Sequence, residues 1–191
     1  MTDGPALWFL NRATGLVLLV LLTLSVVLGV LALGGRPGRG LPRFAVQALH
    51  RNVALLAVLA LTVHVVTAVL DTFVDIRWWH AFVPVGSAYE PLWVGLGTLA
   101  LDVIVLVVLT SLLRARLRHR TWRVVHLGAW LAWALAVAHT VGVGTDLAEP
   151  TAWAVLPTAV CVLAVAAAAA YRLALVARDR DHQHELAGSR P

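Results

Sequence analysis

Four histidines of this sequence lie inside long apolar stretches, where a histidine needs an interior partner. His50 and His64 lie in one stretch, and His126 and His139 lie in a later one. A neutral imidazole nitrogen is a common metal ligand, and an axial histidine is a usual way to hold haem iron. The four histidines therefore predict iron chemistry in an apolar environment, provided that the chain brings them together in pairs.

The spacing of the histidines determines how many metal centres they can serve. A separation of 14 residues between His50 and His64 spans about 21 Å of helix, which is too far for one centre and suits two. It is also close to four full turns, so both side chains leave one face. The 13 residues from His126 to His139 leave these two about 140° apart on an ideal helix. Either the two centres are rotated relative to one another, or the helix departs from ideality, for which Gly128 is a candidate.

Membrane helices are the elements that must position these residues. The chain has 191 residues, of which 60% are hydrophobic, and a mean hydropathy of +0.84, more than a soluble domain usually carries. A bilayer core takes about 20 apolar residues per helix. The sequence predicts an all-α integral membrane bundle of five transmembrane helices, at about 13–33, 45–70, 92–113, 121–143 and 151–177. Residues 1–177 then form one haem-binding transmembrane domain, and the charged tail 178–191 is predicted to be disordered.

The loops between these segments alternate between basic and acidic. The basic ones are centred on 34–44, 114–123 and the stretch after Tyr171, and the acidic ones are 71–91 and 141–151. The positive-inside rule then places the N-terminus outside and the C-terminus in the cytoplasm, which requires an odd number of spans. Both histidine-bearing helices run in the same direction. His50 and His126 are therefore expected at one depth near the inner face, and His64 and His139 at another near the outer face.

The His-x13-His and His-x12-His segments on two parallel helices resemble the ferric reductase-like transmembrane domain, as do Arg12-Ala13-Thr14-Gly15 and His50-Arg51. That superfamily includes NADPH oxidases, ferric-chelate reductases and the haem subunit of the periplasmic methionine sulfoxide reductase system. The resemblance covers roughly residues 8–145. It implies two b-type haems that carry electrons across the membrane, with His50 and His126 on the inner iron and His64 and His139 on the outer iron.

The chain departs from the oxidases and ferric reductases in two respects. It has no fused FAD or NADPH domain, and five helices are expected where many members have six. We therefore expect no FAD or NADPH site in this chain, and a separate flavoprotein or quinol as the electron donor.

Several other side chains are candidates to support such a site. Arg12, which opens the first helix, and Arg51 are candidate partners of haem propionates or interfacial anchors, and Arg123 is a further candidate. Trp133 would line the gap between the two haems or serve as ordinary packing. Asp102, in the middle of the third helix, would hydrogen-bond a ligand histidine, relay a proton or bond to another helix.

Three remaining features are expected to lie outside the site. His80 in the external loop and His119 in the basic internal loop are expected to be interfacial or solvated, with His80 a minor candidate for an external acceptor site. His182 and His184 fall in the charged tail, where a disordered segment is favoured over a metal site. Cys161 lies inside the last span, so we expect it to act as a small apolar residue.

These features predict a di-haem b-type membrane cytochrome that passes electrons from a cytoplasmic or quinol donor to an external acceptor. It would be the electron-transfer subunit of an oxidoreductase in a cell membrane, with the bacterial plasma membrane favoured. A quinol-linked cytochrome b anchor subunit of a larger oxidoreductase is an alternative, and a cofactor-free transporter or structural membrane protein is another. The net charge of +5 arises from arginines in the loops, so it does not predict nucleic-acid binding.

Overall fold

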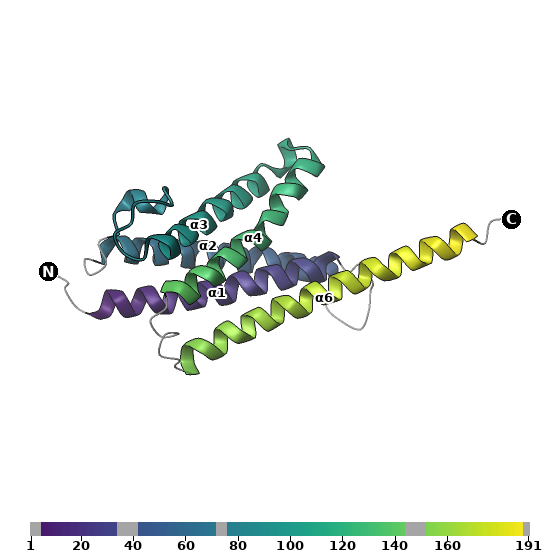
Figure 1. Cartoon of the computed structure of the whole chain (residues 1–191). Helices are drawn as coiled ribbons and strands as arrows, with labels where there is room; N and C mark the ends of the chain where they lie inside the picture. Colours follow the sequence, from purple (N-terminus) through teal and green to yellow (C-terminus); the bar gives the residue numbers. More distant parts are fainter. Residues whose placement is uncertain (1–4, 34–41, 72–75, 144–151, 189–191) are drawn as a thin grey trace.

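A computed structural model describes residues 5–33, 42–71, 76–143 and 152–188 of the chain. All regular secondary structure in these ranges is helical (Figure 1). The helices are α1 (Pro5–Leu33), α2 (Arg43–Leu70), α3 (Pro91–Leu112), α4 (His119–Val143) and α6 (Ala152–Gly188), with 3₁₀ turns η1 (Trp78–Ala81) and η2 (Arg114–Arg116). Each of the five α-helices is long and apolar enough to cross a membrane. The predicted all-helical fold with five membrane-length helices is confirmed. Five such helices are typical of a multi-pass membrane protein.

Two helix ends differ from the sequence-based prediction. α1 begins at Pro5, earlier than expected, and a proline fits the first turn because its missing N–H would be unpaired there. α6 continues to Gly188, so its backbone runs through most of the predicted tail. The predicted last span of 151–177 is therefore shorter than α6. The physical reason is that residues 158–187 contain neither proline nor glycine and are rich in helix-forming alanine and leucine.

The outer faces of the helices are apolar. Large side chains such as Leu59 on α2 and Leu163 on α6 are more than half exposed, and contiguous apolar surface of this kind is rare on soluble monomers. The buried core is small by comparison. Its centre is a cluster of Leu18, Ala57 and Leu61, against which Leu101 and Ile104 of α3 pack.

The helices associate as two hairpins. α1 packs along α2, α3 packs along α4, and α6 lies against α1 (Figure 1). The α3–α4 connection is short, because η2 follows α3 almost immediately and α4 begins at His119. A short connection makes the two helices antiparallel neighbours. α2 and α4 therefore lie in different hairpins.

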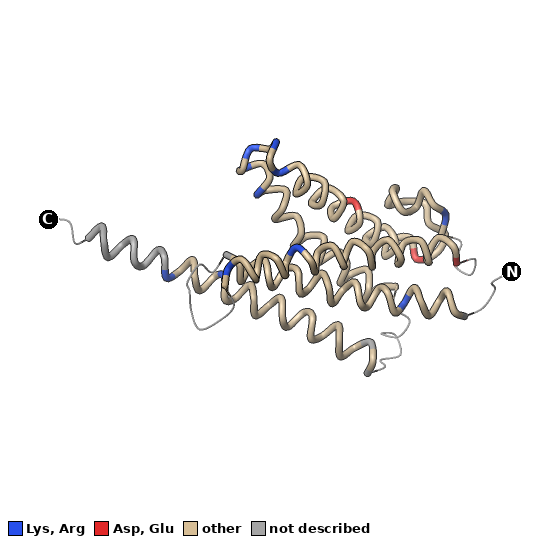
Figure 2. The backbone as a smooth tube through the Cα atoms, turned by 180° about the vertical axis from the view of Figure 1, so that it is seen from behind, with Lys and Arg blue, Asp and Glu red and all other residues tan. Residues whose placement is uncertain are grey.

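Charged residues gather at the ends of the bundle. Figure 2 shows a group of Lys or Arg positions around the α3–α4 connection, and the acidic positions away from that connection. In the sequence these basic residues are Arg114, Arg116, Arg118, Arg120 and Arg123. Glu90 caps the opposite end of α3, where it adopts a left-handed backbone with φ of 36°. The loop residues 34–41, 72–75 and 144–151, which hold Arg36, Arg39, Asp75, Asp146 and Glu149, lie outside the described residues.

Candidate functional site

The structure brings the four histidines of α2 and α4 together as two pairs. The ring centroids of His50 and His126 are 6.2 Å apart, and those of His64 and His139 are 6.3 Å apart. The ring planes are close to perpendicular, at 71° and 82°. These are the pairs expected from equal depth on parallel helices.

The centroid separation fits one metal atom between the two rings of a pair. An imidazole nitrogen lies about 2.0 Å from a bound transition metal and about 1.1 Å from its own ring centre, so two axial imidazoles have centroids about 6.2 Å apart. Among the described residues, no cluster of three or more His, Cys, Asp or Glu side chains is placed to hold a metal ion. Each pair thus offers two protein ligands, which suits a macrocycle that supplies the other four.

A hydrogen bond from the other ring nitrogen fixes the tautomer of three of these histidines. The Nδ1 of His50 lies 2.9 Å from the Ser25 carbonyl oxygen, that of His64 lies 3.1 Å from the Asn11 carbonyl oxygen, and that of His139 lies 2.8 Å from the Trp93 carbonyl oxygen. A carbonyl only accepts, so each Nδ1 carries the proton and donates it. The Nε2 lone pair of each ring is then available for a metal, as in most histidine metal ligands.

A glycine stands four residues after each of these carbonyls. Gly15 follows Asn11, Gly29 follows Ser25 and Gly97 follows Trp93. In a helix the carbonyl of residue i already accepts the N–H of residue i+4, so a ring that shares this carbonyl must pass directly over residue i+4. A Cβ added at Gly97 would lie 2.7 Å from the His139 Nδ1, and one added at Gly15 would lie 3.0 Å from the His64 Cε1. Glycine therefore provides the space for the ring at these two positions.

His126 is held in a different way. Its Nδ1 lies 3.4 Å from the hydroxyl oxygen of Ser111, and this hydroxyl donates to the Val107 carbonyl oxygen at 2.6 Å. Because the single hydroxyl proton is used on Val107, Ser111 accepts from the Nδ1–H of His126. Val107 and Ser111 thus occupy the places that a carbonyl and a glycine occupy for the other three rings. The serine side chain extends the acceptor outward from the helix backbone.

α4 carries both of its histidines without a break. Its α-helical backbone is continuous from His119 to Val143, so the 13-residue spacing is accommodated within one helix. A Cβ added at Gly128 would lie 3.4 Å from the Val103 Cγ1 of α3, which is an ordinary contact.

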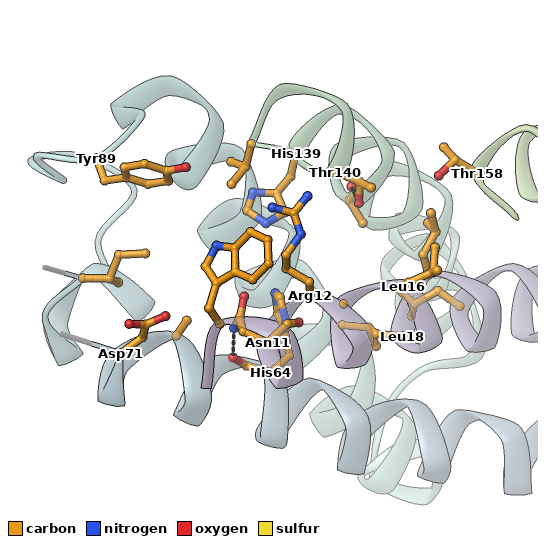
Figure 3. A pocket seen from close by; sticks show the side chains of 18 of the residues that line it. Asn11, Arg12, Leu16, Leu18, His64, Asp71, Tyr89, His139, Thr140 and Thr158 are labelled. Carbon is orange, nitrogen blue, oxygen red and sulfur yellow. Dashed lines mark hydrogen bonds between the residues drawn. The ribbon is translucent and has the colours of Figure 1, made fainter. Parts of the chain in front are cut away.

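Two cavities adjoin the pair of His64 and His139, and both histidines line each of them. One opens toward α1 and α6, and the other lies on the side of α3 and η1. Figure 3 shows His64, His139 and Arg12 pointing into the first cavity, with Tyr89 and Asp71 at one end and Thr158 of α6 at the other. The lining is largely apolar, with a few polar groups, as is usual for a cofactor site.

Arg12 and Asn11 hold the α1 side of this cavity. The guanidinium of Arg12 lies 4.4 Å from the centroid of the Trp8 ring, a cation–π geometry. The side-chain amide of Asn11 donates to the His64 carbonyl oxygen at 2.8 Å (Figure 3) and to the Thr67 hydroxyl at 3.2 Å. Asn11 therefore ties α1 to α2 at the ring that its own carbonyl orients.

His80 lies inside the protein, contrary to the expectation of an interfacial or solvated side chain. It is 6% exposed and lines the second cavity beside the outer pair. The backbone N–H of Arg77 donates to its Nδ1 at 3.2 Å, and the Thr98 hydroxyl donates to its carbonyl oxygen at 2.6 Å. The first bond lies within η1 and its N-cap, and the second joins η1 to α3.

The pair of His50 and His126 has an aromatic neighbour. The indole ring of Trp122 stacks on His126, with centroids 5.0 Å apart and planes at 25°. The Arg114 guanidinium lies 5.1 Å from the Trp122 ring centroid. The indole N–H of Trp122 is buried and has no hydrogen-bond partner among the described residues.

The other candidate residues lie in varied places. Arg51, Arg123 and His119 are exposed, and none of the three lines the two cavities of the outer pair. Trp133 donates its indole N–H to the buried Thr23 hydroxyl at 2.9 Å, which joins α4 to α1 between the two pairs. Asp102 is exposed on α3. Cys161 is buried, as expected, and the side chains of His182 and His184 lie outside the described residues.

Sequence reasoning missed the residues that orient the rings. They are Asn11, Gly15, Ser25, Gly29, Trp93, Gly97 and Ser111. One sequence signal exists in retrospect, because Gly15 and Gly29 are 14 residues apart, as are Gly97 and Ser111. This step repeats the 14-residue step of the α2 histidines.

The fold and site define a multi-pass helical membrane protein with two stacked histidine pairs between two helical hairpins. Residues 6–146 match the family described as a domain of unknown function, DUF8596, and the chain belongs to this family. The match contains all four helices that hold and orient the histidines. No curated protein and no solved structure shows significant similarity to the chain.

Proposed function

We propose that the chain is a di-haem b-type membrane cytochrome, similar to ferric reductases, that carries electrons from one side of a cell membrane to the other. The observation that supports this proposal is the geometry of the two histidine pairs. In each pair the ring separation suits one iron, and every Nδ1 is directed to an acceptor, so that every Nε2 is available as a ligand. When bound, each haem supplies reversible one-electron chemistry.

The residues of the chain would hold, orient and enclose the two haems. His50 and His126 would ligate one iron, and His64 and His139 the other. Carbonyls of α1 and α3 and the Ser111 hydroxyl fix the ring orientations and raise ligand basicity. The largely apolar cavity lining would surround the haem at His64 and His139, and Arg12 is placed to bind an anionic propionate there. Arg51 is exposed beside His50 and would serve the inner propionates.

The distance between the pairs suits transport across the membrane. The two α2 histidines are about 21 Å apart along the helix, a large part of the roughly 30 Å hydrocarbon thickness. We further propose that the end with the α3–α4 arginines faces the cytoplasm, by the positive-inside rule. The N-terminus is then outside, His50 and His126 form the inner site, and His64 and His139 form the outer site. A bacterial plasma membrane fits this arrangement.

Haem content of purified protein is the first test. Full-length protein produced with ample haem should bind two b-type haems per chain, with spectra of low-spin iron held by two histidines. His50→Ala and His126→Ala should each remove the same haem, and His64→Ala and His139→Ala the other. His119→Ala, on the same helix but exposed, is the matched control and should retain both. A protein that binds no haem would point to the alternative of a cofactor-free transporter or structural protein.

The electron donor is identified in a second experiment. Membranes that contain the chain are supplied either with a quinol or with NADPH and a flavoprotein reductase, and haem reduction is followed by absorbance. We expect reduction through the separate flavoprotein or the quinol, because no FAD or NADPH site is proposed in this chain. Stoichiometric co-purification of a catalytic subunit together with quinol reduction would favour the anchor-subunit alternative. The external acceptor is then the oxidant that reoxidises the outer haem.

A further inference from the structure

Asp102 has an unusual position for a carboxyl group. It lies near the middle of α3, 11 residues after Pro91 and 10 before Leu112, and thus about 15 Å from either end of the helix. Its side chain is exposed. No hydrogen bond or ion pair of Asp102 is found within the described part of the chain. A carboxyl group that faces lipid at this depth is costly, and such residues normally face a partner.

Asp102 does not face the histidine pairs. At 100° per residue it is rotated by about 140° from Gly97, which contacts His139. The Nδ1 atoms of all four paired histidines already have other acceptors. The predicted alternative in which Asp102 bonds a ligand histidine is therefore not realised in this structure, and its carboxyl group has no partner among the described residues.

A regular row of exposed leucines accompanies Asp102. Leu99, Leu106, Leu109 and Leu113 are between 39% and 51% exposed. With Asp102 they follow one another in steps of three, four, three and four residues. We call these five residues the α3 seam. Alternating steps of three and four are the pattern of a coiled-coil interface, in which a single polar position sets register and oligomeric state.

We propose that the α3 seam is the interface with a second copy of this chain. Copies inserted in one membrane share an orientation, so a two-fold axis along the membrane normal places equal residues of two parallel helices opposite one another. Asp102 then faces Asp102 of the other copy. A neutral carboxylic acid has one donor and one acceptor, so two of them satisfy each other, and no cation from another kind of subunit is required. Polar residues and close packing are what drive helix association in lipid.

The test measures oligomeric state in lipid. Full-length protein is reconstituted at decreasing protein-to-lipid ratio, and the dimer fraction is measured by single-molecule photobleaching. Wild-type chain should dimerise, and Asp102→Leu should raise the dimer dissociation constant by about tenfold or more. Asp102→Asn should keep the dimer, because an amide also has both a donor and an acceptor. Leu59→Ala, at a position that is also exposed but lies on α2, is the matched control and should have no effect.

A second measurement tests the register and guards against misfolding. In a Cys161→Ala background, Leu106→Cys in the α3 seam, which leaves Asp102 in place, should form a symmetric disulfide dimer on oxidation. Leu59→Cys should not, and circular dichroism reports helix content. A monomeric wild-type chain in lipid, or an Asp102→Leu variant that dimerises like the wild type, would overturn the proposal. So would loss of a different co-purifying protein in Asp102→Leu without change in self-association. Haem content does not enter these readouts, so this proposal and the proposed function can fail separately.

Discussion

At the scale of single residues, the acceptor of each Nδ1–H determines the character of the histidine as a ligand. Ser25, Asn11 and Trp93 present backbone carbonyls at 2.8–3.1 Å. Ser111 presents a hydroxyl at 3.4 Å, which makes the hydrogen bond of His126 the weakest of the four. A stronger acceptor makes an imidazole more basic and a better ligand for oxidised iron. The inner pair therefore combines one strongly and one weakly supported ligand, whereas both outer histidines are strongly supported.

Ser111 is accordingly expected to influence the redox potential of the inner haem. Ser111→Ala removes the acceptor, so His126 becomes less basic, the inner midpoint potential rises and haem affinity falls about 10- to 100-fold. Ser111→Gly restores the carbonyl-and-glycine pattern of the other three rings and frees the Val107 carbonyl, so the potential falls instead. Potentiometric titration followed by absorbance measures both shifts.

The haem proposed at His64 and His139 provides the internal control for this prediction, because neither Trp93 nor Asn11 is altered. Ser111→Thr keeps the hydroxyl and should stay near the wild-type value. Two results would show that Ser111 acts through general packing and not through its hydrogen bond. One is an equal shift in the midpoint potentials of both haems. The other is a shift of the inner potential in the same direction in the Ala and Gly variants.

At the scale of helices, each hairpin contributes half of both sites. α2 and α4 supply the ligands, and α1 and α3 supply the acceptors and the space for the rings. The outer site uses Gly15 and Gly97, and the inner site uses Gly29 and Ser111, with the same 14-residue step on both helices. The two hairpins are thus alike in function without evident sequence identity.

The helices themselves were predictable because apolar length alone identifies a membrane span. The pairing of His50 with His126 and of His64 with His139 followed from equal depth on parallel helices. The acceptors were not predictable, because backbone carbonyls leave no residue type in the sequence. Gly15 and Gly97 are 2 of 14 glycines, and only contacts between helices distinguish them. His80 was misplaced because its burial depends on how η1 packs against α3.

Alanine substitutions at the ring-facing glycines test whether α1 and α3 provide the space for the histidine rings. Gly97→Ala should displace His139, because its Cβ would lie 2.7 Å from the ring nitrogen, and overpacking of this kind costs about 1–3 kcal/mol. Loss of the outer haem is the expected result, measured as haem content and as the spectrum of each haem.

Gly29→Ala is the matched control within the same chain. A Cβ there would lie 3.6 Å from the His50 Cε1, which is an ordinary contact, so both haems should remain. If Gly97→Ala bound two haems as tightly as Gly29→Ala, close approach at Gly97 would have no part in positioning His139.

At the scale of the whole molecule, the asymmetric distribution of charge predicts the orientation of the bundle in the membrane. Arginines surround the α3–α4 connection, while Glu90 and Asp71 lie at the other ends of α3 and α2 (Figure 2). The Coulomb and insertion preferences that keep arginine in the cytoplasm act on short loops such as this connection. The direction of electron flow in the proposed function depends on this orientation, because it decides which histidine pair faces the donor.

Cysteine labelling in intact cells tests the orientation. In a Cys161→Ala background, Val85→Cys in the α2–α3 connection should react with a membrane-impermeant maleimide added outside. His119→Cys at the start of α4 should react only after the membrane is opened, because the proposed orientation places the arginine-rich end in the cytoplasm. Both side chains are exposed, and neither substitution removes an arginine, so the charge pattern that sets the orientation is preserved. External labelling of His119→Cys together with protection of Val85→Cys would show that the chain has the opposite orientation in the membrane. His50 and His126 would then form the outer site, and an electron donor in the cytoplasm would have to act at His64 and His139.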